Sequence, residues 1–136
     1  MKLHVLVDTF AVAKVQAGVD YTAWAHEGEL VQIVRTPHAL SLVCRDDAVP
    51  AGVTAERGWR CFASNDPLDI NQAGILASIS APLAQAGISI FVISSFDNDY
   101  VLVRSRDLER ALETLERAGF TVERTTEVER TTEAKR

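Results

Sequence analysis

Apolar residues in the second half of the chain recur with the period of a strand and then with the period of a helix. Residues 71–86 carry apolar side chains three and four positions apart, which predicts a helix with one buried face. Gly87 predicts its end, and Pro82 predicts a bend because it removes one backbone hydrogen bond. A second helix is predicted over residues 105–119, where leucines repeat at helical spacing before a glycine. Strands are predicted at 58–64, 88–94, 100–104 and 120–124.

This order of elements, strand–helix–strand–strand–helix–strand, is that of the split βαβ or ferredoxin-like fold. It predicts an α+β domain in which an antiparallel four-stranded sheet carries both helices on one face. The second half of the chain, residues 58–125, is therefore predicted to be a complete βαββαβ unit.

The first half of the chain follows the same plan in reduced form. Residues 30–47 repeat the later hairpin of residues 88–107: an apolar strand, a polar turn, a second apolar strand, an arginine and an acid. The irregular residues 48–57 stand where a second helix would be. Two further strands are predicted at 3–7 and 10–15, and a short helix at 21–27.

These patterns predict three segments along the chain. Residues 1–57 form a degenerate unit, residues 58–125 form the complete unit, and residues 126–136 form a disordered tail. The tail repeats the string VERTTE, and Val128 is the one large apolar residue that it could bury.

The net charge and the two cysteines limit the partners and the cellular compartment that the sequence predicts. The formal net charge of −5 and the lack of a basic block argue against nucleic acid and against an anionic membrane surface. No apolar run is long enough to span a bilayer, and the N-terminal residues are interpreted as a strand instead of a signal peptide. Cys44 and Cys61 sit in apolar runs without CxxC spacing, as buried thiols do in a reducing compartment. These features predict a cytoplasmic protein.

Residues with catalytic or metal-binding chemistry are sparse. His4, His26 and His38 are scattered, with no second ligand at helical spacing, so no metal site and no cofactor are predicted. Phosphate-binding and nucleophile motifs are missing from the sequence, and no histidine lies near Ser94 or Ser95 to act as a base. The sequence therefore predicts a protein that is not an enzyme.

One pair of features points to a ligand. The predicted helix opens near Gln72 to Ile75, where free amides favour a carboxylate, and Gly74 would let a ligand approach the backbone. The turn that follows the next strand contains Asp97 and Asp99, either of which could face a cation. Together they would suit a zwitterionic amino acid. The alternative is a turn that is merely polar and a helix capped by its own preceding polar residues.

The strings NDPLD and GILASISAPLAQAGISIFVISSFDNDYVLV, with LHVLVDTFAVAKV and RTPHALSLVC ahead of them, resemble small bacterial ACT-domain proteins of the CASTOR type, relatives of a cytosolic arginine sensor. The resemblance runs from about Leu3 to Phe120. It implies a tandem ACT protein without catalysis, in which amino acids bind at interfaces between paired domains. The ligand-contacting segments of the family correspond here to Asn71, Gln72, Ala73, Gly74, Ile75, Ser94, Ser95, Phe96 and Asp99.

Two departures from the family accompany this resemblance. The arginine sensor carries an acidic residue where this chain has Gln72, and it has four ACT units where this chain has two. A site between units of one long chain would here form between two subunits, so the resemblance implies a homodimer, with a regulated enzyme or signalling protein as a further partner. The rival hypothesis is a protein–protein interaction module that binds no ligand.

Overall fold

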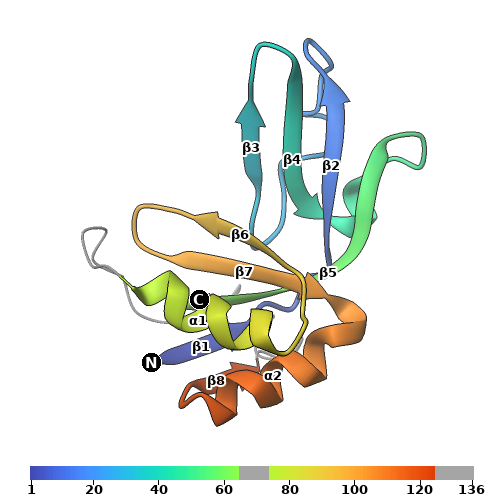
Figure 1. Ribbon diagram of the computed structural model, residues 1–136. Helices are drawn as coiled ribbons and strands as arrows, with labels where there is room; N and C mark the ends of the chain where they lie inside the picture. Colours follow the sequence, from blue (N-terminus) through green and yellow to red (C-terminus); the bar gives the residue numbers. More distant parts are fainter. Residues whose placement is uncertain (65–73, 125–136) are drawn as a thin grey trace, which may run out of the picture. The chain divides into compact units, whose positions relative to one another are not determined.

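The computed structural model describes residues 1–64 and 74–124, and the chain divides into two compact units (Figure 1). Unit 1 combines Met1–Val7 with the chain from Arg60 onward, and unit 2 is Asp8–Trp59. The N-terminal strand therefore belongs with the second half of the chain by its contacts, whereas the sequence grouped it with residues 1–57. The tail predicted at 126–136 lies outside the described residues.

Unit 1 is built on a sheet with the strand order β6-β7-β5-β1-β8. The strands are β1 (Lys2–Val5), the second part of β5 (Thr54–Ser64), β6 (Ile90–Ser94), β7 (Asp99–Arg104) and β8 (Thr121–Arg124). Without β1, this is the order of a ferredoxin-like sheet, and the predicted α+β fold class is confirmed.

Strand β1 is a fifth strand of this sheet, which the sequence pattern predicted as a strand at residues 3–7 but grouped with residues 1–57. It lies between β5 and β8, antiparallel to β5 with Leu3 opposite Ser64, and parallel to β8 with Leu3 opposite Val122. Leu3 and Val5 are both buried in the core of unit 1. This alternation of buried positions explains why β1 is held centrally in the sheet and does not fray as a terminus.

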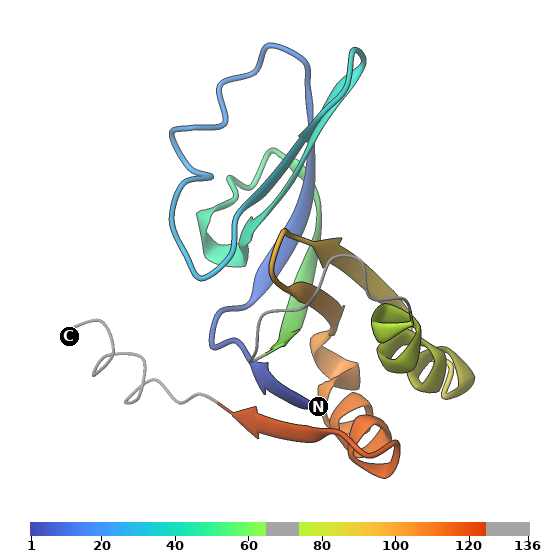
Figure 2. The same ribbon diagram turned by 90° about the vertical axis from the view of Figure 1, so that its left-hand side faces the viewer.

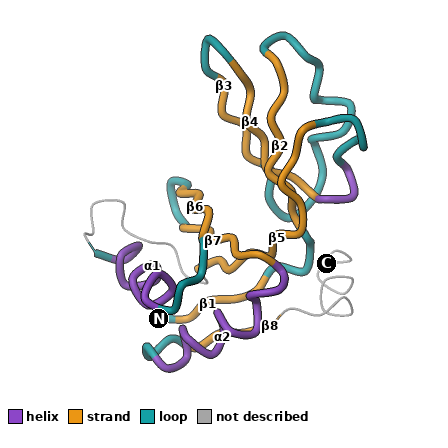
Figure 3. The backbone as a smooth tube through the Cα atoms, turned by 45° about the vertical axis from the view of Figure 1, so that its right-hand side comes forward, coloured by secondary structure: helices purple, strands orange, loops and turns teal. Residues whose placement is uncertain are grey.

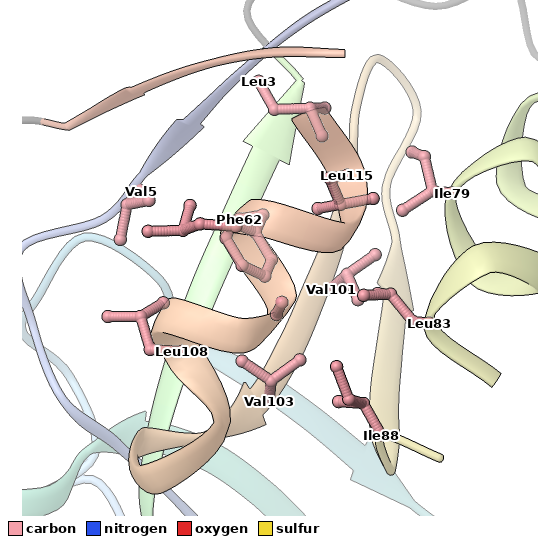
Figure 4. Packing of buried hydrophobic residues seen from close by; sticks show 12 residues of the cluster. Leu3, Val5, Phe62, Ile79, Leu83, Ile88, Val101, Val103, Leu108 and Leu115 are labelled. Atoms are coloured by element: carbon pink, nitrogen blue, oxygen red, sulfur yellow. The ribbon is translucent and has the colours of Figure 1, made fainter. Parts of the chain in front are cut away.

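Two α-helices cover one face of the unit 1 sheet, as Figure 2 shows. They are α1 (Ile75–Gln85) and α2 (Leu108–Arg117), the latter preceded by the 3-10 turn η2 (Ser105–Asp107). Helix α2 buries the four apolar residues of its predicted stripe, Leu108, Ala111, Leu112 and Leu115. Figure 4 shows these side chains meeting Phe62 of β5 and Ile79 of α1, so one core joins both helices to the sheet.

Unit 2 has four antiparallel strands in the order β3-β4-β2-β5. They are β2 (Phe10–Gln16), β3 (Gln32–Arg35), β4 (Ala39–Arg45) and the first part of β5, with a 3-10 turn η1 (Asp46–Ala48) after β4. Taken in chain order, this is the same 2-3-1-4 arrangement of strands that the ferredoxin-like sheet has. Tandem ACT-like units, as predicted, therefore describe the chain.

The short helix predicted at residues 21–27 is wrong. The structure has turns there, with one helical hydrogen bond from the Ala25 amide to the Tyr21 carbonyl at 2.8 Å. Seven residues are too few to offset the cost of starting a helix, and Gly28 follows with a φ of 121°, outside the helical region.

Loops take the place of helices over the core of unit 2. Figure 3 shows the connection between β2 and β3 as a long loop, and Figure 2 shows it on the same side of the sheet as η1. Ala25 and Val49, from these two segments, pack with Leu40, Leu42 and other strand residues in one buried cluster. No helix in the described part of the chain is long and apolar enough to cross a membrane.

Candidate functional site

The turn between β6 and β7 is closed by the side chain of Ser95. The Ser95 amide donates to the Asn98 carbonyl at 2.8 Å, the Ser95 hydroxyl donates to the same carbonyl at 3.0 Å, and the Asn98 amide donates to the Ser95 hydroxyl at 3.1 Å. Tight hairpins usually need glycine or asparagine with positive φ, but every positive φ among the described residues belongs to a glycine. Ser95 therefore closes the turn with one backbone hydrogen bond and two hydrogen bonds of its hydroxyl.

Ser94 and Asp99 face each other across the same hairpin, one residue further from the tip. They are paired in the β6–β7 register, and the Ser94 hydroxyl donates to Asp99 Oδ1 at 2.7 Å. This bond gives Asp99 a role within the hairpin. It also leaves acceptor capacity on the carboxylate, because two carboxylate oxygens offer about four lone-pair directions.

Asn98 anchors the turn to the end of β5. Ser64 is the last described residue before the gap at 65–73, and its hydroxyl lies 2.9 Å from Asn98 Oδ1. Ser64 is 4% exposed, so this bond satisfies a buried hydroxyl. The sequence reading placed Ser64 in a strand and assigned it no role, since nothing local marks it as the partner of a residue 34 positions away.

Helix α1 begins after Gly74, which has a φ of +86° in the left-handed region. Among the described residues, no atom lies within 4 Å of the position that a Cβ would take at Gly74. The Gly74 carbonyl accepts from the Ser78 amide at 3.0 Å, which starts the helix at Ile75. Asn71, Gln72 and Ala73, the other predicted contacts on this segment, lie outside the described residues.

Chain direction brings the start of α1 and the serine–aspartate turn to the same end of unit 1. A short connection joins α1 to β6, so β6 runs back along the helix and its last residue, Ser94, returns towards the end where α1 begins. Figure 1 shows both at one end of unit 1. The structure therefore gathers Ser94, Ser95, Phe96 and Asp99 in one turn, and Gly74 and Ile75 start α1 at the same end of unit 1.

Phe96 and Asp97 form the tip of this turn, and both are exposed. Phe96 is 78% exposed, the highest value among the large hydrophobic residues of the described chain. No group of three or more His, Cys, Asp or Glu within the described ranges could hold a metal ion. What the turn offers is therefore one aromatic face, two carboxylates and serine hydroxyls, and the N-terminus of α1 with its partial positive charge lies at the same end of unit 1.

Outside this turn, one buried cysteine of unit 2 has a pKa that its surroundings shift. Burial raises the pKa of the Cys44 thiol, with Asp46 adding a smaller effect in the same direction. A raised pKa keeps a thiol protonated and unreactive, so Cys44 behaves as a packing residue.

The two ferredoxin-like sheets place the chain in the class of ACT folds. An ACT domain family model matches residues 54–117, and a second family model, described as an N-terminal domain, matches residues 8–52. Protein Atu0741 from Agobacterium tumefaciens is 39% identical, covers 92% of this chain over 93% of its own length, and superposes with a TM-score of 0.85. The chain belongs to the same family as this protein, and it is an ACT-domain protein related to the CASTOR proteins.

Two human proteins link this chain to the CASTOR proteins by sequence similarity. CASTOR3P is 32% identical over 103 residues, which cover 76% of this chain and 59% of that protein. The cytosolic arginine sensor for mTORC1 subunit 1 is 38% identical over 60 residues, covering 43% of this chain and 18% of the sensor. The matched region therefore spans less than two thirds of the length of either curated relative.

Proposed function

We propose that this chain is a non-catalytic regulatory protein of the cytoplasm that binds an amino acid at its second ACT unit. The observation that supports the proposal is that the start of α1 at Gly74 and the turn that contains Asp99 lie at the same end of unit 1. The arginine-sensing relative and the ACT family match agree with a regulatory role.

In this proposal the two charged groups of the ligand are bound by opposite ends of the site. The amides at the start of α1, near Ile75, receive the ligand carboxylate, because the helix dipole favours negative charge there. Asp99 accepts from the ammonium or guanidinium group, while the Ser94 hydroxyl keeps its carboxylate in position at 2.7 Å. Asn71, Gln72 and Ala73 complete the helix side of the site, and Ser95 and Phe96 complete the turn side.

The same proposal includes a homodimer. Strand β6 is an edge of the unit 1 sheet, and an unpaired edge carries backbone groups that a second strand can satisfy. A second copy beside this edge would also lie next to the turn that follows β6. The ligand would then be shared by two subunits, and its binding would change how the pair engages a regulated enzyme or signalling protein.

The test is a thermal-shift screen of the full chain against the twenty amino acids, followed by calorimetric titration. A ligand at a hundredfold its Kd should stabilise the protein by about 2.7 kcal/mol. Asp99→Asn should weaken binding roughly ten- to a hundredfold, as expected when a charge-assisted hydrogen bond is lost. Asp97→Asn, at the same turn, is the matched control and should bind nearly as wild type. Equal affinity for Asp99→Asn and wild type would show that Asp99 is not the partner of the cation.

Gly74 is a poor position for this test, although it is central to the proposal. Its φ of +86° strains any side-chain-bearing residue, so a substitution would change the helix start as well as block the amides. The aspartate pair is preferable because both variants keep the backbone and the side-chain shape.

A second candidate function is an interaction module without a ligand, and the exposure of Phe96 favours it. Phe96 is 78% exposed at the hairpin tip, and a partner surface that covers it would remove its apolar area from water. Light scattering of wild type and Phe96→Ser separates the two candidates. Loss of a dimer in Phe96→Ser, with no amino acid giving a thermal shift, would support the interaction module over the sensor.

A further inference from the structure

Unit 2 contains a cavity of about 430 Å³ between the turn that leaves β2 and the edge of the sheet. It lies in the other unit from the amino-acid site proposed above. Its lining residues come from the turn after β2 and from strands β3 and β4: Gly18, Val19, Tyr21, Ile33, Arg35 and Leu40. The volume is in the range that holds a small molecule.

The lining of this cavity is mixed: Val19, Ile33 and Leu40 contribute apolar side chains beside the polar groups of Tyr21 and Arg35. Leu40, 3% exposed, belongs to the buried core of unit 2, and Tyr21 packs against that core. Val19 and Ile33 are 42% and 40% exposed, among the few large hydrophobic residues of the described chain that remain so accessible. An apolar group entering here would contact the edge of an existing core and remove exposed apolar surface from water.

Arg35 is the only cationic side chain among the lining residues, and it lies opposite Leu40 in the β3–β4 register. Its guanidinium makes no hydrogen bond or ion pair with any residue in the described part of the chain. A guanidinium offers a planar fork of donors that matches a carboxylate. Tyr21 adds a phenolic hydroxyl to the same lining.

Asp20 is the acidic residue that lies next to the lining residues Val19 and Tyr21 in sequence, and its carboxylate is already hydrogen-bonded within its own turn. Asp20 Oδ1 accepts from the Thr22 amide at 2.9 Å and from the Thr22 hydroxyl at 2.5 Å, and these two bonds lower the pKa of Asp20. Asp20 thus stabilises the turn and is not bonded to Arg35. Among the described residues, the positive charge of Arg35 is therefore available to a ligand.

The turn is also fixed by backbone hydrogen bonds. The Val19 amide donates to the Gln16 carbonyl at 3.2 Å, and the Ala25 amide donates to the Tyr21 carbonyl at 2.8 Å. The walls are therefore formed before any ligand arrives, which reduces the entropy that binding must overcome.

We propose that this cavity binds a small organic carboxylate that carries an apolar group. The carboxylate pairs with the Arg35 guanidinium, and the apolar group lies against Val19, Ile33 and Leu40. The assignment rests on a cation that has no partner among the described residues and on exposed apolar side chains in the lining of the same cavity. It is independent of the amino-acid site of unit 1.

The experiment is a two-dimensional amide NMR titration of the full chain with 3-phenylpropionate, compared with the neutral 3-phenylpropanamide and with acetate. Saturable shifts are expected for the amides of the turn after β2 and of β3, with the amide compound and acetate at least about tenfold weaker. Arg35→Gln should lose about tenfold or more in affinity for 3-phenylpropionate, since it removes a charge-assisted pair. Lys14→Gln is the control, because Lys14 is an exposed cation of the same unit that does not line this cavity.

Two results would overturn the proposal. One is equal affinity of 3-phenylpropionate for wild type and Arg35→Gln, which would remove the guanidinium from recognition. The other is saturable shifts confined to residues 74–99, which would place the carboxylate in unit 1. The two proposed sites are reported by amides of different units. A negative result for the cavity beside Arg35 therefore leaves the test of the amino-acid site unaffected, and a negative result for the amino-acid site leaves the test of this cavity unaffected.

Discussion

The hydroxyl of Ser64 lies 2.9 Å from the side-chain oxygen of Asn98, which joins the end of β5 to the turn between β6 and β7. Asn98 thus holds the turn from two sides. Its backbone bonds to Ser95 close the tip, and its side chain meets a hydroxyl that is buried in unit 1. The position of Asp99, the next residue, depends on both contacts.

The first prediction concerns this anchor. Asn98→Ala should lower the free energy of unfolding by about 1–3 kcal/mol, because it leaves the Ser64 hydroxyl buried without its partner. Asp97→Ala, one position away at the exposed tip, should change it by less than about 0.5 kcal/mol. Urea unfolding followed by circular dichroism measures both. Equal stability of the two variants would mean that Ser64 finds another partner.

The sequence predicted the hairpin and the polar character of its turn, but not the reason for each polar residue. Ser95 and Asn98 close the turn, and Ser94 bonds to Asp99, so most of the polar side chains have partners inside the chain. Local sequence could not reveal the Ser64 bond, because register between distant strands decides it. The alternative of a merely polar turn therefore explains part of this segment, and the ligand site has to rest on Asp99 and on the start of α1.

The second prediction compares two phenylalanines. Phe62 is 1% exposed in the core of unit 1, and Phe62→Ala should cost about 3–5 kcal/mol of unfolding free energy by leaving a cavity. Phe96→Ala, at the exposed tip, should stay within about 0.5 kcal/mol of wild type. Chemical denaturation of both variants is the measurement. A large loss for Phe96→Ala would indicate that the tip is covered in solution.

The third prediction concerns an ion pair between α2 and β8. Arg124 donates to Glu109 Oε2 at 2.6 Å, and this hydrogen bond lowers the pKa of the Glu109 carboxyl, with charge attraction from Arg124 and Arg60 adding to it. A lowered folded-state pKa stabilises the fold at pH values above the unfolded pKa of glutamate. That stabilisation is lost as the pH falls through the folded pKa.

Arg124→Gln should therefore raise the pKa of Glu109 back towards the ordinary value for glutamate. Carboxyl carbon NMR shifts followed against pH provide the measurement. Lys2→Gln is the matched control, because Lys2 pairs with Glu123 at 3.7 Å and not with Glu109. An unchanged Glu109 titration in Arg124→Gln would exclude the hydrogen bond as the cause.

The ferredoxin-like fold class followed from the sequence pattern, but three features did not. The short helix at 21–27 has the composition of a helix and too little length to nucleate one. Strand β1 enters the sheet of unit 1 through a pairing with β8, more than a hundred residues away, which no local pattern encodes. The cavity beside Arg35 was also missed, because it exists only once the turn after β2 folds against β3.

The last prediction concerns the segment of unit 2 that replaces a second helix. Arg57 of β5 donates to the carbonyls of Asp46, Val49 and Pro50 at 2.9, 3.0 and 3.2 Å, and its guanidinium lies 3.1 Å from Asp46 Oδ1. The Gly58 amide donates to Asp46 Oδ2 at 2.7 Å. The connection after β4 is therefore held to β5 by one guanidinium and one carboxylate, where a helix would have used buried apolar side chains.

Arg57→Ala should accordingly lower the free energy of unfolding by about 1.5–3 kcal/mol, the range for hydrogen bonds to a charged group. Arg57→Lys should recover only part of this loss, since an ammonium is a point charge and cannot reach the same acceptors with a planar fork. Arg106→Ala, an exposed arginine of η2, is the control and should have little effect. Full recovery by lysine would show that charge alone holds the segment, whereas partial recovery supports the clamp geometry as the substitute for the missing helix.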